Sequence, residues 1–246
     1  MNFIADFGNS YLKIAKEHNG KLCKITRFKS NDIESLKKWL RGVCGHQKFK
    51  LFFTSVLDDN FTKKIISNIN KHLSSIEQFK SSKSILSVTC AYGQPSKLGS
   101  DRWAQIVAAN KIFRKDCMII SCGSAISVDC VTSNGSHKGG LIFSGAGSYI
   151  NCFSDIHNLK NFKLTKIKTR DLLQNNTRQQ ISKGYKIMIS SAINEIYASF
   201  TKVAKGSPKV IISGGYAKEL ALDLKYRTYV EPYFVLKSLA FLQDKI

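Results

Sequence analysis

The feature that most restricts the fold of this chain is a unit that occurs twice in its sequence. Near the N-terminus an apolar run leads into Gly8, a second apolar run follows, and Asn19-Gly20 precedes a third. The same order returns at Gly123 and Asn134-Gly135. Gly123 follows Gly8 by 115 residues (123 minus 8), and Gly135 follows Gly20 by the same number (135 minus 20). Asn-Gly between alternating runs is a strong hairpin signal. The sequence therefore predicts the unit strand, glycine turn, strand, hairpin turn, strand twice, with a plain duplication of hairpins as the alternative.

Strand and helix patterns alternate after each of these units. Further strands are predicted at 50–56, 84–90 and 209–213. Helices are predicted from Ser30 or Asp32 to Gly42 and at 60–73, 101–113, 178–203 and 232–242. Such alternation is typical of an α/β protein. The seam between the halves is expected near 112–117, which gives an N-terminal domain of 1–115 and a C-terminal domain of 116–246.

Cysteine usage and hydropathy indicate where such a protein works. The chain has 246 residues, and its odd number of scattered cysteines includes no Cys-x-x-Cys pair, which is typical of reduced thiols in the cytoplasm. No apolar run approaches the roughly 20 residues of a membrane span, and the N-terminal run lacks a basic leader. We therefore expect a cytoplasmic protein without a membrane partner. The cysteines are Cys23, Cys44, Cys90, Cys117, Cys122, Cys130 and Cys152.

The formal net charge of +21 raises the question of nucleic-acid binding. Lysines and arginines are spread along the chain, often in pairs, and the longest basic cluster, at 160–170, alternates with apolar residues. No zinc-finger spacing, aromatic RNA-binding signature or leucine-zipper pattern is present. A nucleic-acid partner is therefore not expected, whereas a positive field would attract anionic substrates.

The glycine turns are candidate phosphate-binding loops. Glycine lets backbone N–H groups approach phosphate oxygens, and serine or asparagine side chains add donors. Asp6, just before the first turn, would repel phosphate directly but can hold Mg²⁺ or its water shell. A third turn, 213–215, directly precedes a predicted helix, and a nucleotide can lie at such a helix start. Three such turns in this order resemble the superfamily of actin, sugar kinases and chaperone ATPases. That resemblance implies two duplicated actin-like (ribonuclease H-like) domains with a cleft between them.

A second constellation, Tyr92 followed by Gly99-Ser100-Asp101-Arg102, precedes and begins the predicted helix at 101–113. A carboxylate at this place can take a proton from an attacking hydroxyl, as in other phosphoryl transfers. The neighbouring guanidinium can clamp an anionic group on the acceptor. The structural alternative is an aspartate that caps the helix, beside an exposed arginine.

Taken together, these motifs resemble the type III pantothenate kinases over nearly the whole chain. The matching segments, in the family's order, are "DFGNSYLK" (6–13), Tyr92 with "GSDR" (99–102), "SCGSAISVD" (121–129), "GSHKGG" (135–140) and "SGG" (213–215). The resemblance implies a kinase that uses ATP and Mg²⁺ to phosphorylate pantothenate to 4′-phosphopantothenate, the first step of coenzyme A biosynthesis. It also implies a homodimer whose acceptor contacts are shared across the interface.

Two other functions remain open from the sequence. A non-catalytic regulatory or nucleic-acid-binding protein could use the same scaffold, because function is decided at the site and not by the fold. A kinase acting on another small hydroxy acid would keep the chemistry and change only the acceptor pocket. The presence of both Asp6 and the "GSDR" corner favours an active enzyme.

Carried over by position, the resemblance implies a role for each matching residue. Asp101 is the general base, Asp6 holds Mg²⁺ through water, and Asp129 has a metal or water-network role. Thr177, just before a helix, contacts the acceptor bound to the partner subunit. The ATP-binding residues are Asp6, Phe7, Gly8, Asn9, Ser10, Tyr11, Leu12, Lys13 and Ser124. The pantothenate-binding residues are Tyr92, Gly99, Ser100, Asp101, Arg102 and Thr177.

Three serines depart from the family's pattern. Ser121 stands where many relatives have the aspartate that binds a monovalent cation, and a hydroxyl holds K⁺ or NH₄⁺ far less strongly than a carboxylate. A dependence on these cations is therefore not expected to carry over unchanged. Ser124 replaces threonine and keeps the hydroxyl. Ser144 replaces a proline, which is expected to loosen its turn.

Overall fold

The computed structural model describes residues 1–156, 159, 162–164, 171–204 and 206–246, which form two compact units. The first unit comprises 1–114, 134–139 and 233–246, and the second comprises 115–133 and 140–232. The C-terminal segment and the 134–139 turn thus pack with the N-terminal part of the chain. The domain limits expected from the sequence, 1–115 and 116–246, remain a prediction. Most of the basic cluster at 160–170 lies outside the described residues.

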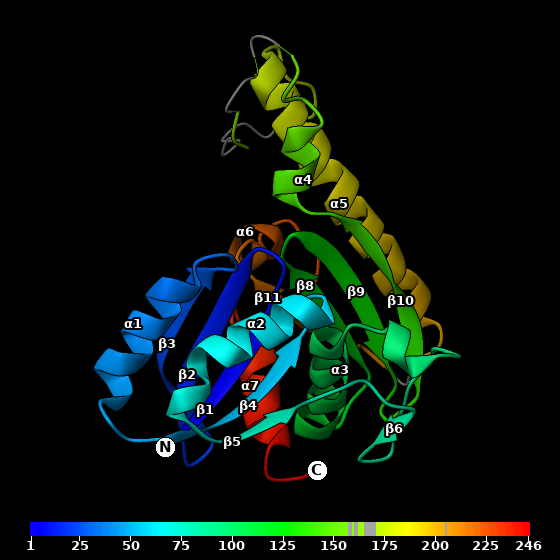
Figure 1. Cartoon of the computed structure of the whole chain (residues 1–246). Helices are drawn as coiled ribbons and strands as arrows, with labels where there is room; N and C mark the ends of the chain where they lie inside the picture. The colour runs from blue at the N-terminus through cyan, green and yellow to red at the C-terminus, as the bar shows by residue number, and fades with distance from the viewer. Residues whose placement is uncertain (157–158, 160–161, 165–170, 205) are drawn as a thin grey trace. The chain divides into compact units, whose positions relative to one another are not determined.

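The first unit is built on a five-stranded sheet with the strand order β3-β2-β1-β4-β5 (Figure 1). The first three strands are antiparallel neighbours, whereas β4 and β5 run parallel to β1. The strands are β1 (Asn2–Phe7), β2 (Tyr11–His18), β3 (Lys21–Lys29), β4 (Phe49–Ser55) and β5 (Leu73–Gln78). The helices are α1 (Ile33–Cys44), α2 (Asp59–Ile69), α3 (Ser100–Phe113) and α7 (Phe234–Leu242).

The second unit repeats this sheet, with the order β10-β9-β8-β11-β12. Strands β8 and β9 are antiparallel, and β11 and β12 run parallel to β8. The strands are β8 (Cys117–Cys122), β9 (Ala125–Val131), β10 (His137–Ser144), β11 (Lys209–Gly214) and β12 (Thr228–Val230). The helices are α4 (Ala146–Asn151), α5 (Thr177–Thr201) and α6 (Ala217–Ala221). The predicted α/β class and the duplicated unit are therefore confirmed.

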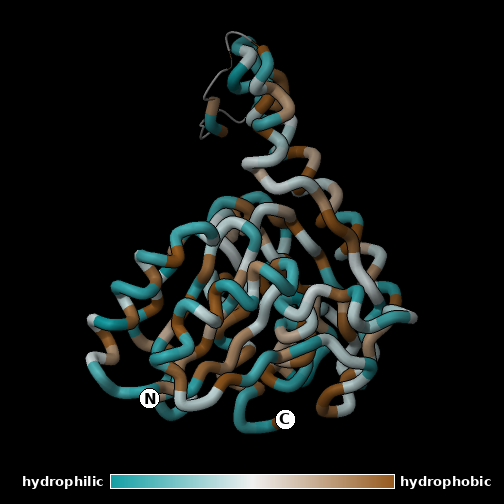
Figure 2. Tube along the Cα trace, viewed as in Figure 1, coloured by the Kyte–Doolittle hydropathy of each residue, from teal (hydrophilic) through white to brown (hydrophobic). Residues whose placement is uncertain are grey.

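Alternation along the strands decides which side chains reach the core of the first unit. One face of the sheet carries Phe3, Ala5 and Phe7 of β1, and these residues cluster with buried residues of α1 and α2. Asp6 occupies the alternate position, on the opposite face of the sheet. Helix α7 also packs close to β1. The hydropathy colouring shows hydrophobic residues concentrated along the strands and a mixture along the outer helices (Figure 2). Within the described ranges, no helix is both long enough and apolar enough to cross a bilayer.

Two predicted boundaries are wrong, for identifiable reasons. Helix α1 passes through Gly42 and ends at Cys44. The cap residue Gly45 follows, and its φ of 56° lies in the left-handed region that glycine adopts readily. The strand predicted at 84–90 is only a short hairpin, β6 (Ser84–Ile85) and β7 (Val88–Thr89). The strand next to β4 is β5 instead, and its mostly exposed sequence LSSIEQ lacks the apolar pattern that would reveal it.

Candidate active site

The turn between β1 and β2 is short and is fixed by hydrogen bonds within the turn and from Ser30. The backbone N–H of Gly8 donates to the carbonyl of Tyr11 at 3.1 Å, and a Cβ at Gly8 would lie only 3.1 Å from the same oxygen. Ser30 fixes the turn twice: its hydroxyl donates to the Gly8 carbonyl at 2.7 Å and its N–H donates to the Ser10 carbonyl at 3.2 Å. Asn9 and Ser10 at the tip are exposed. The turn therefore presents polar groups on a fixed backbone, as a phosphate-binding loop requires.

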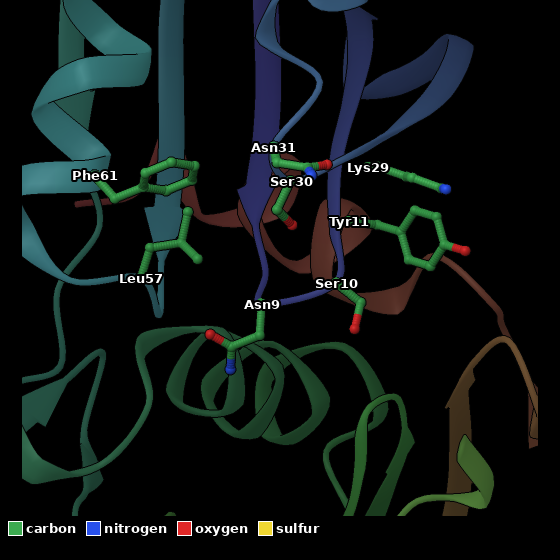
Figure 3. A pocket seen from close by; sticks show the side chains of 8 residues that line it. All are labelled: Asn9, Ser10, Tyr11, Lys29, Ser30, Asn31, Leu57 and Phe61. Atoms are coloured by element: carbon green, nitrogen blue, oxygen red, sulfur yellow. The ribbon is translucent and has the colours of Figure 1, made fainter. Parts of the chain in front are cut away.

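A pocket of about 550 Å³ opens beside this turn in the first unit. Figure 3 shows Asn9 and Ser10 on the turn, with the apolar side chains of Leu57 and Phe61 to one side and Lys29 to the other. The complete lining is Asn9, Ser10, Tyr11, Lys29, Ser30, Asn31, Leu57 and Phe61. Phe7 and Leu12, which the sequence places in the ATP loop, are buried in the core. Any contact that these two residues make with a ligand therefore has to come from their backbone.

Asp6 and Lys13 form an ion pair directly behind the turn. They face each other in the β1–β2 register, and Lys13 Nζ lies 2.7 Å from Asp6 Oδ2. Asp6 is only 3% exposed. Burial by itself lowers the pKa of Lys13, but the charge of Asp6, the hydrogen bond to it and the charge of Asp101 together raise that pKa. Lys13 thus stays a cation beside a buried carboxylate.

Asp101 lies in the first turn of α3, near this pair. Burial, followed by the negative charge of Asp6, raises the pKa of Asp101 to about 6. A hydrogen bond from the Arg102 N–H to Oδ1 (2.8 Å) and the charges of Arg102 and Lys13 act in the opposite direction. Gly99 leaves room for this carboxylate, because a Cβ at that position would lie 2.7 Å from Asp101 Oδ1 and would displace it. A carboxylate with a pKa near 6 is ionised at neutral pH and can still accept a proton.

Arg102 and Tyr92 meet beside Asp101, as the sequence predicts for an acceptor site. Arg102 Nη1 donates to the Tyr92 hydroxyl at 3.4 Å. The segment that carries Tyr92 is held by His137, whose Nδ1 accepts from the Ala91 N–H at 3.3 Å. The rings of Tyr92 and His137 are nearly parallel, with centroids 6.4 Å apart, and His137 is 3% exposed. His137 lies inside the "GSHKGG" motif, but its contact with Ala91 is not visible in the sequence.

The Ser100 hydroxyl is engaged within the protein. It accepts a hydrogen bond from Thr54 Oγ1 at 2.5 Å and donates to the Ser55 carbonyl at 3.1 Å. A contact between Ser100 and an acceptor therefore falls to its backbone. Thr54 was not singled out by the sequence motifs. The available signal was a Thr-Ser pair in the otherwise apolar segment "LFFTSV".

The second unit contributes two further glycine turns at adjoining strand ends. Gly214, with φ of 96°, lies so close to β8 that a Cβ would be 2.2 Å from the Cys122 carbonyl. Ser124 is exposed in the β8–β9 turn. Its backbone is supported by Gly145, where a Cβ would be 2.4 Å from the Ser124 carbonyl. The close packing explains why these positions are glycine. It leaves the Ser124 side chain toward solvent.

Two further predicted residues of the second unit, Asp129 and Thr177, lie outside these turns. Asp129 is 2% exposed in β9, opposite Ile119. Thr177 is the exposed first residue of α5, and the Asn176 side chain caps this helix by accepting from the N–H groups of Arg178 and Gln179. Across the residues that the structure describes, no group of three or more His, Cys, Asp or Glu side chains could hold a metal by itself.

Comparisons of the sequence with known proteins give matches to one protein family. Residues 2–199 match the sequence profile of the family described as type III pantothenate kinase. A type III pantothenate kinase of Thermosipho melanesiensis is 24% identical over 260 residues, which cover 100% of this chain and 99% of that protein. A type III pantothenate kinase of Sulfurihydrogenibium sp. is 25% identical over 257 residues, which cover 98% and 99%.

Solved structures show the same fold at lower identity. A Campylobacter jejuni protein described as a Baf family transcriptional activator superposes with a TM-score of 0.66 at 20% identity, and 98% of each chain is covered. A Sinorhizobium meliloti protein described as a 2-dehydro-3-deoxygalactonokinase gives a TM-score of 0.58 at 12% identity, with 99% of each chain covered. These likenesses concern the fold alone, and they confirm the predicted actin-like class.

Proposed function

Because this chain belongs to the type III pantothenate kinase family, we propose that its first unit performs the family's reaction with Asp101 as the general base. The protein is an enzyme that phosphorylates pantothenate with ATP and a divalent metal ion in coenzyme A biosynthesis. The observation that carries the assignment of the base is the placement of Asp101: a partly buried carboxyl with a pKa of about 6, close to the Asp6–Lys13 pair and next to Arg102.

The proposed chemistry is one displacement at phosphorus. The primary hydroxyl of pantothenate attacks the γ-phosphorus of ATP, an O–P bond forms, and the bond to the β-phosphate oxygen breaks to release ADP. The proton of the attacking hydroxyl passes to the Asp101 carboxylate. Asp101 thereby orients the nucleophile as well as accepting its proton. Arg102, steadied by its contact with Tyr92, is suited to the carboxylate of pantothenate.

The first phosphate loop is proposed to hold the nucleotide. The Gly8–Ser10 turn offers backbone N–H groups and exposed polar side chains, and Lys13 adds a positive charge behind it. Ser124 and the 213–215 turn are proposed as the nucleotide contacts of the second unit. In both units the backbone is fixed by glycine close approaches before any ligand binds, which favours preorganised binding.

We propose that Asp6 holds the metal ion through a water molecule, and that Asp129 is a second candidate for this role. Carboxylate oxygen is the donor type that Mg²⁺ prefers. One carboxylate oxygen of Asp6 accepts a hydrogen bond from Lys13, and the proposal assigns the other oxygen to the metal ion's water shell. When bound, Mg²⁺ neutralises charge on the phosphates. Asp6 serves in the proposal to position that ion and to keep Lys13 protonated and oriented.

A monovalent cation is not part of the proposal. Ser121 lies in β8 opposite Ser127 and beside Ser213 in the parallel register, so the position is surrounded by neutral hydroxyls on both neighbouring strands. Without a carboxylate from Ser121, K⁺ gains little by exchanging its water shell for this position. We therefore expect catalysis to proceed in Na⁺ buffer.

We also propose a homodimer formed through the second unit. Leu141 and Ile142 of β10 are 54% and 59% exposed, and Met188 of α5 is 45% exposed. Exposed apolar side chains of this kind mark interaction surfaces, and Thr177 begins the same helix as Met188. Ile142→Asp should produce monomers in sedimentation velocity and raise the KM for pantothenate. Leu222→Asp, at an 86% exposed leucine elsewhere in the unit, is the matched control and should stay dimeric.

The experiment that tests the function is ADP release from Mg-ATP with pantothenate, with other small hydroxy acids, and with no acceptor. The expected result is turnover that depends on pantothenate, with 4′-phosphopantothenate identified by mass spectrometry. Turnover with another acceptor alone would move the assignment to a different kinase. A folded protein that binds ATP and turns over no acceptor would favour the regulatory or nucleic-acid-binding alternative.

A further inference from the structure

Thr54 joins the strand that carries Asp6 to the helix that carries Asp101. It is opposite Asp6 in the parallel β1–β4 register and has no exposed surface. Its hydroxyl donates to Ser100 Oγ at 2.5 Å, and Asp101 is the next residue along the chain. One connection between the two acids therefore runs through the side-chain hydrogen bond from Thr54 to Ser100.

The start of α3 depends on this contact because it lacks an ordinary cap. Gly99 stands at the N-cap position, and no side-chain hydrogen bond caps the helix there. Instead, Ser100 accepts from Thr54 and donates to the Ser55 carbonyl at 3.1 Å. Two successive residues of β4 thus fix the first residue of the helix. This arrangement sets where Asp101 stands relative to the sheet.

We propose that Thr54 is a positioning residue for catalysis: its hydroxyl fixes the first turn of α3 and thereby places the Asp101 carboxylate relative to Asp6 and the first phosphate loop. The inference rests on the proposed function, in which Asp101 is the base. General-base catalysis is sensitive to such placement, and a shift of about 1 Å can cost about 100-fold in rate.

The second unit offers an internal comparison for this role. Ser213 lies beside Ser121 in the parallel β8–β11 register, as Thr54 lies beside Asp6. The Ser213 hydroxyl, however, reaches the Pro232 carbonyl at 3.5 Å, just before α7, and the α7 sequence FVLKSLAFL contains no acidic residue. The hydroxyl at this strand position is thus tied to a helix that bears an acid only in the unit that carries Asp101.

The test compares Thr54→Val with Thr54→Ser and with Thr62→Val. Valine keeps the volume of threonine and removes the donor, whereas serine keeps the donor. Thr62 is a matched control, because it is 6% exposed in the same unit and its hydroxyl shares a 2.7 Å hydrogen bond with Ser55 Oγ. We expect Thr54→Val to lower kcat by at least about 10-fold, with KM for ATP and pantothenate within about threefold. Thr54→Ser should restore most of kcat, and Thr62→Val should keep it.

A double-mutant cycle with Asp101→Asn separates positioning from a general loss of structure. If Thr54 acts through Asp101, Thr54→Val should lower the residual turnover of Asp101→Asn by less than about twofold. The melting temperatures of Thr54→Val and Thr62→Val should both fall, because each variant loses one side-chain hydrogen bond.

Three results would overturn the inference. An active wild type in which Thr54→Val matches Thr62→Val in kcat rejects it while leaving the proposed function intact. The inference is also rejected if Thr54→Val lowers the turnover of Asp101→Asn by the same factor by which it lowers the turnover of the wild type. A wild-type protein without pantothenate-dependent turnover rejects the proposed function, and this inference with it.

Discussion

The two units of this protein share one scaffold and differ in the chemistry at its centre. Their sheets have the same order strand for strand, β3-β2-β1-β4-β5 and β10-β9-β8-β11-β12. Asp6 and Ser121, 115 residues apart (121 minus 6), occupy the first strand of each unit before the glycine turn. Asp6 faces Lys13 and forms a 2.7 Å ion pair, whereas Ser121 faces Ser127.

The difference shows how a duplicated scaffold divides its work. In the first unit, Asp6, Lys13, Asp101 and Arg102 form a group of interacting charges beside a glycine turn. In the second unit, Ser121 is paired with the neutral hydroxyl residues Ser127 and Ser213, and Gly214 and Gly145 are closely packed. We infer that the first unit supplies acid–base chemistry and charge, and that the second supplies mainly backbone contacts to the nucleotide.

The largest contrast should come from matched substitutions at the equivalent positions. Asp6→Asn removes the proposed metal-side carboxylate and the partner of Lys13, and should lower kcat/KM for ATP by at least about 100-fold. Ser121→Ala removes only a neutral hydroxyl and should change kcat/KM by less than about threefold. Steady-state kinetics, with circular dichroism to verify folding, measure both. Equal effects of the two substitutions would break the comparison.

The sequence predicts the shared scaffold better than it predicts the difference between the units. The Gly8 and Gly123 turns and their hairpins follow from local patterns, because turn and strand preferences depend on neighbouring residues. Asp6 and Asp101 could be assigned because they stand in motifs. The contact of Thr54 with Ser100 could not, since the two residues are 46 positions apart and only tertiary packing joins them.

The raised pKa of Asp101 is likewise a property of the folded protein, because it arises from burial and from the neighbouring Asp6. The edge strand β5 is not predicted by the sequence for a local reason. Its residues are mostly exposed, so little apolar periodicity marks it.

The pH dependence of turnover should reveal the acid in the first unit. Because the base must be ionised, kcat/KM for pantothenate should fall below pH 6, about tenfold for each pH unit once Asp101 is protonated. The measurement is kcat/KM between pH 4.5 and 8.5, with melting temperatures recorded at each pH to exclude unfolding. A flat profile down to pH 4.5 would argue against Asp101 as the base.

The smallest effect should come from the monovalent cation, which probes the second unit. Replacing Na⁺ by K⁺ should change the wild-type rate by less than about twofold, because Ser121 offers no charge to the ion. Ser121→Asp should create a response to K⁺ that the wild type lacks. A strong dependence of the wild type on K⁺ would show that neutral groups suffice, and the comparison of the two units would then need revision.

The most direct test of the account is Asp101→Asn, measured for turnover and for melting temperature at pH 8. Burial raises the folded-state pKa of Asp101 above its ordinary value, so its contribution to stability is present at low pH and is lost as the pH rises through about 6. Asparagine removes the cost of desolvating this charge. We predict turnover at least about 100-fold lower and a melting temperature unchanged or a few degrees higher. A variant that keeps its turnover, or that loses turnover together with a lower melting temperature, would contradict the account.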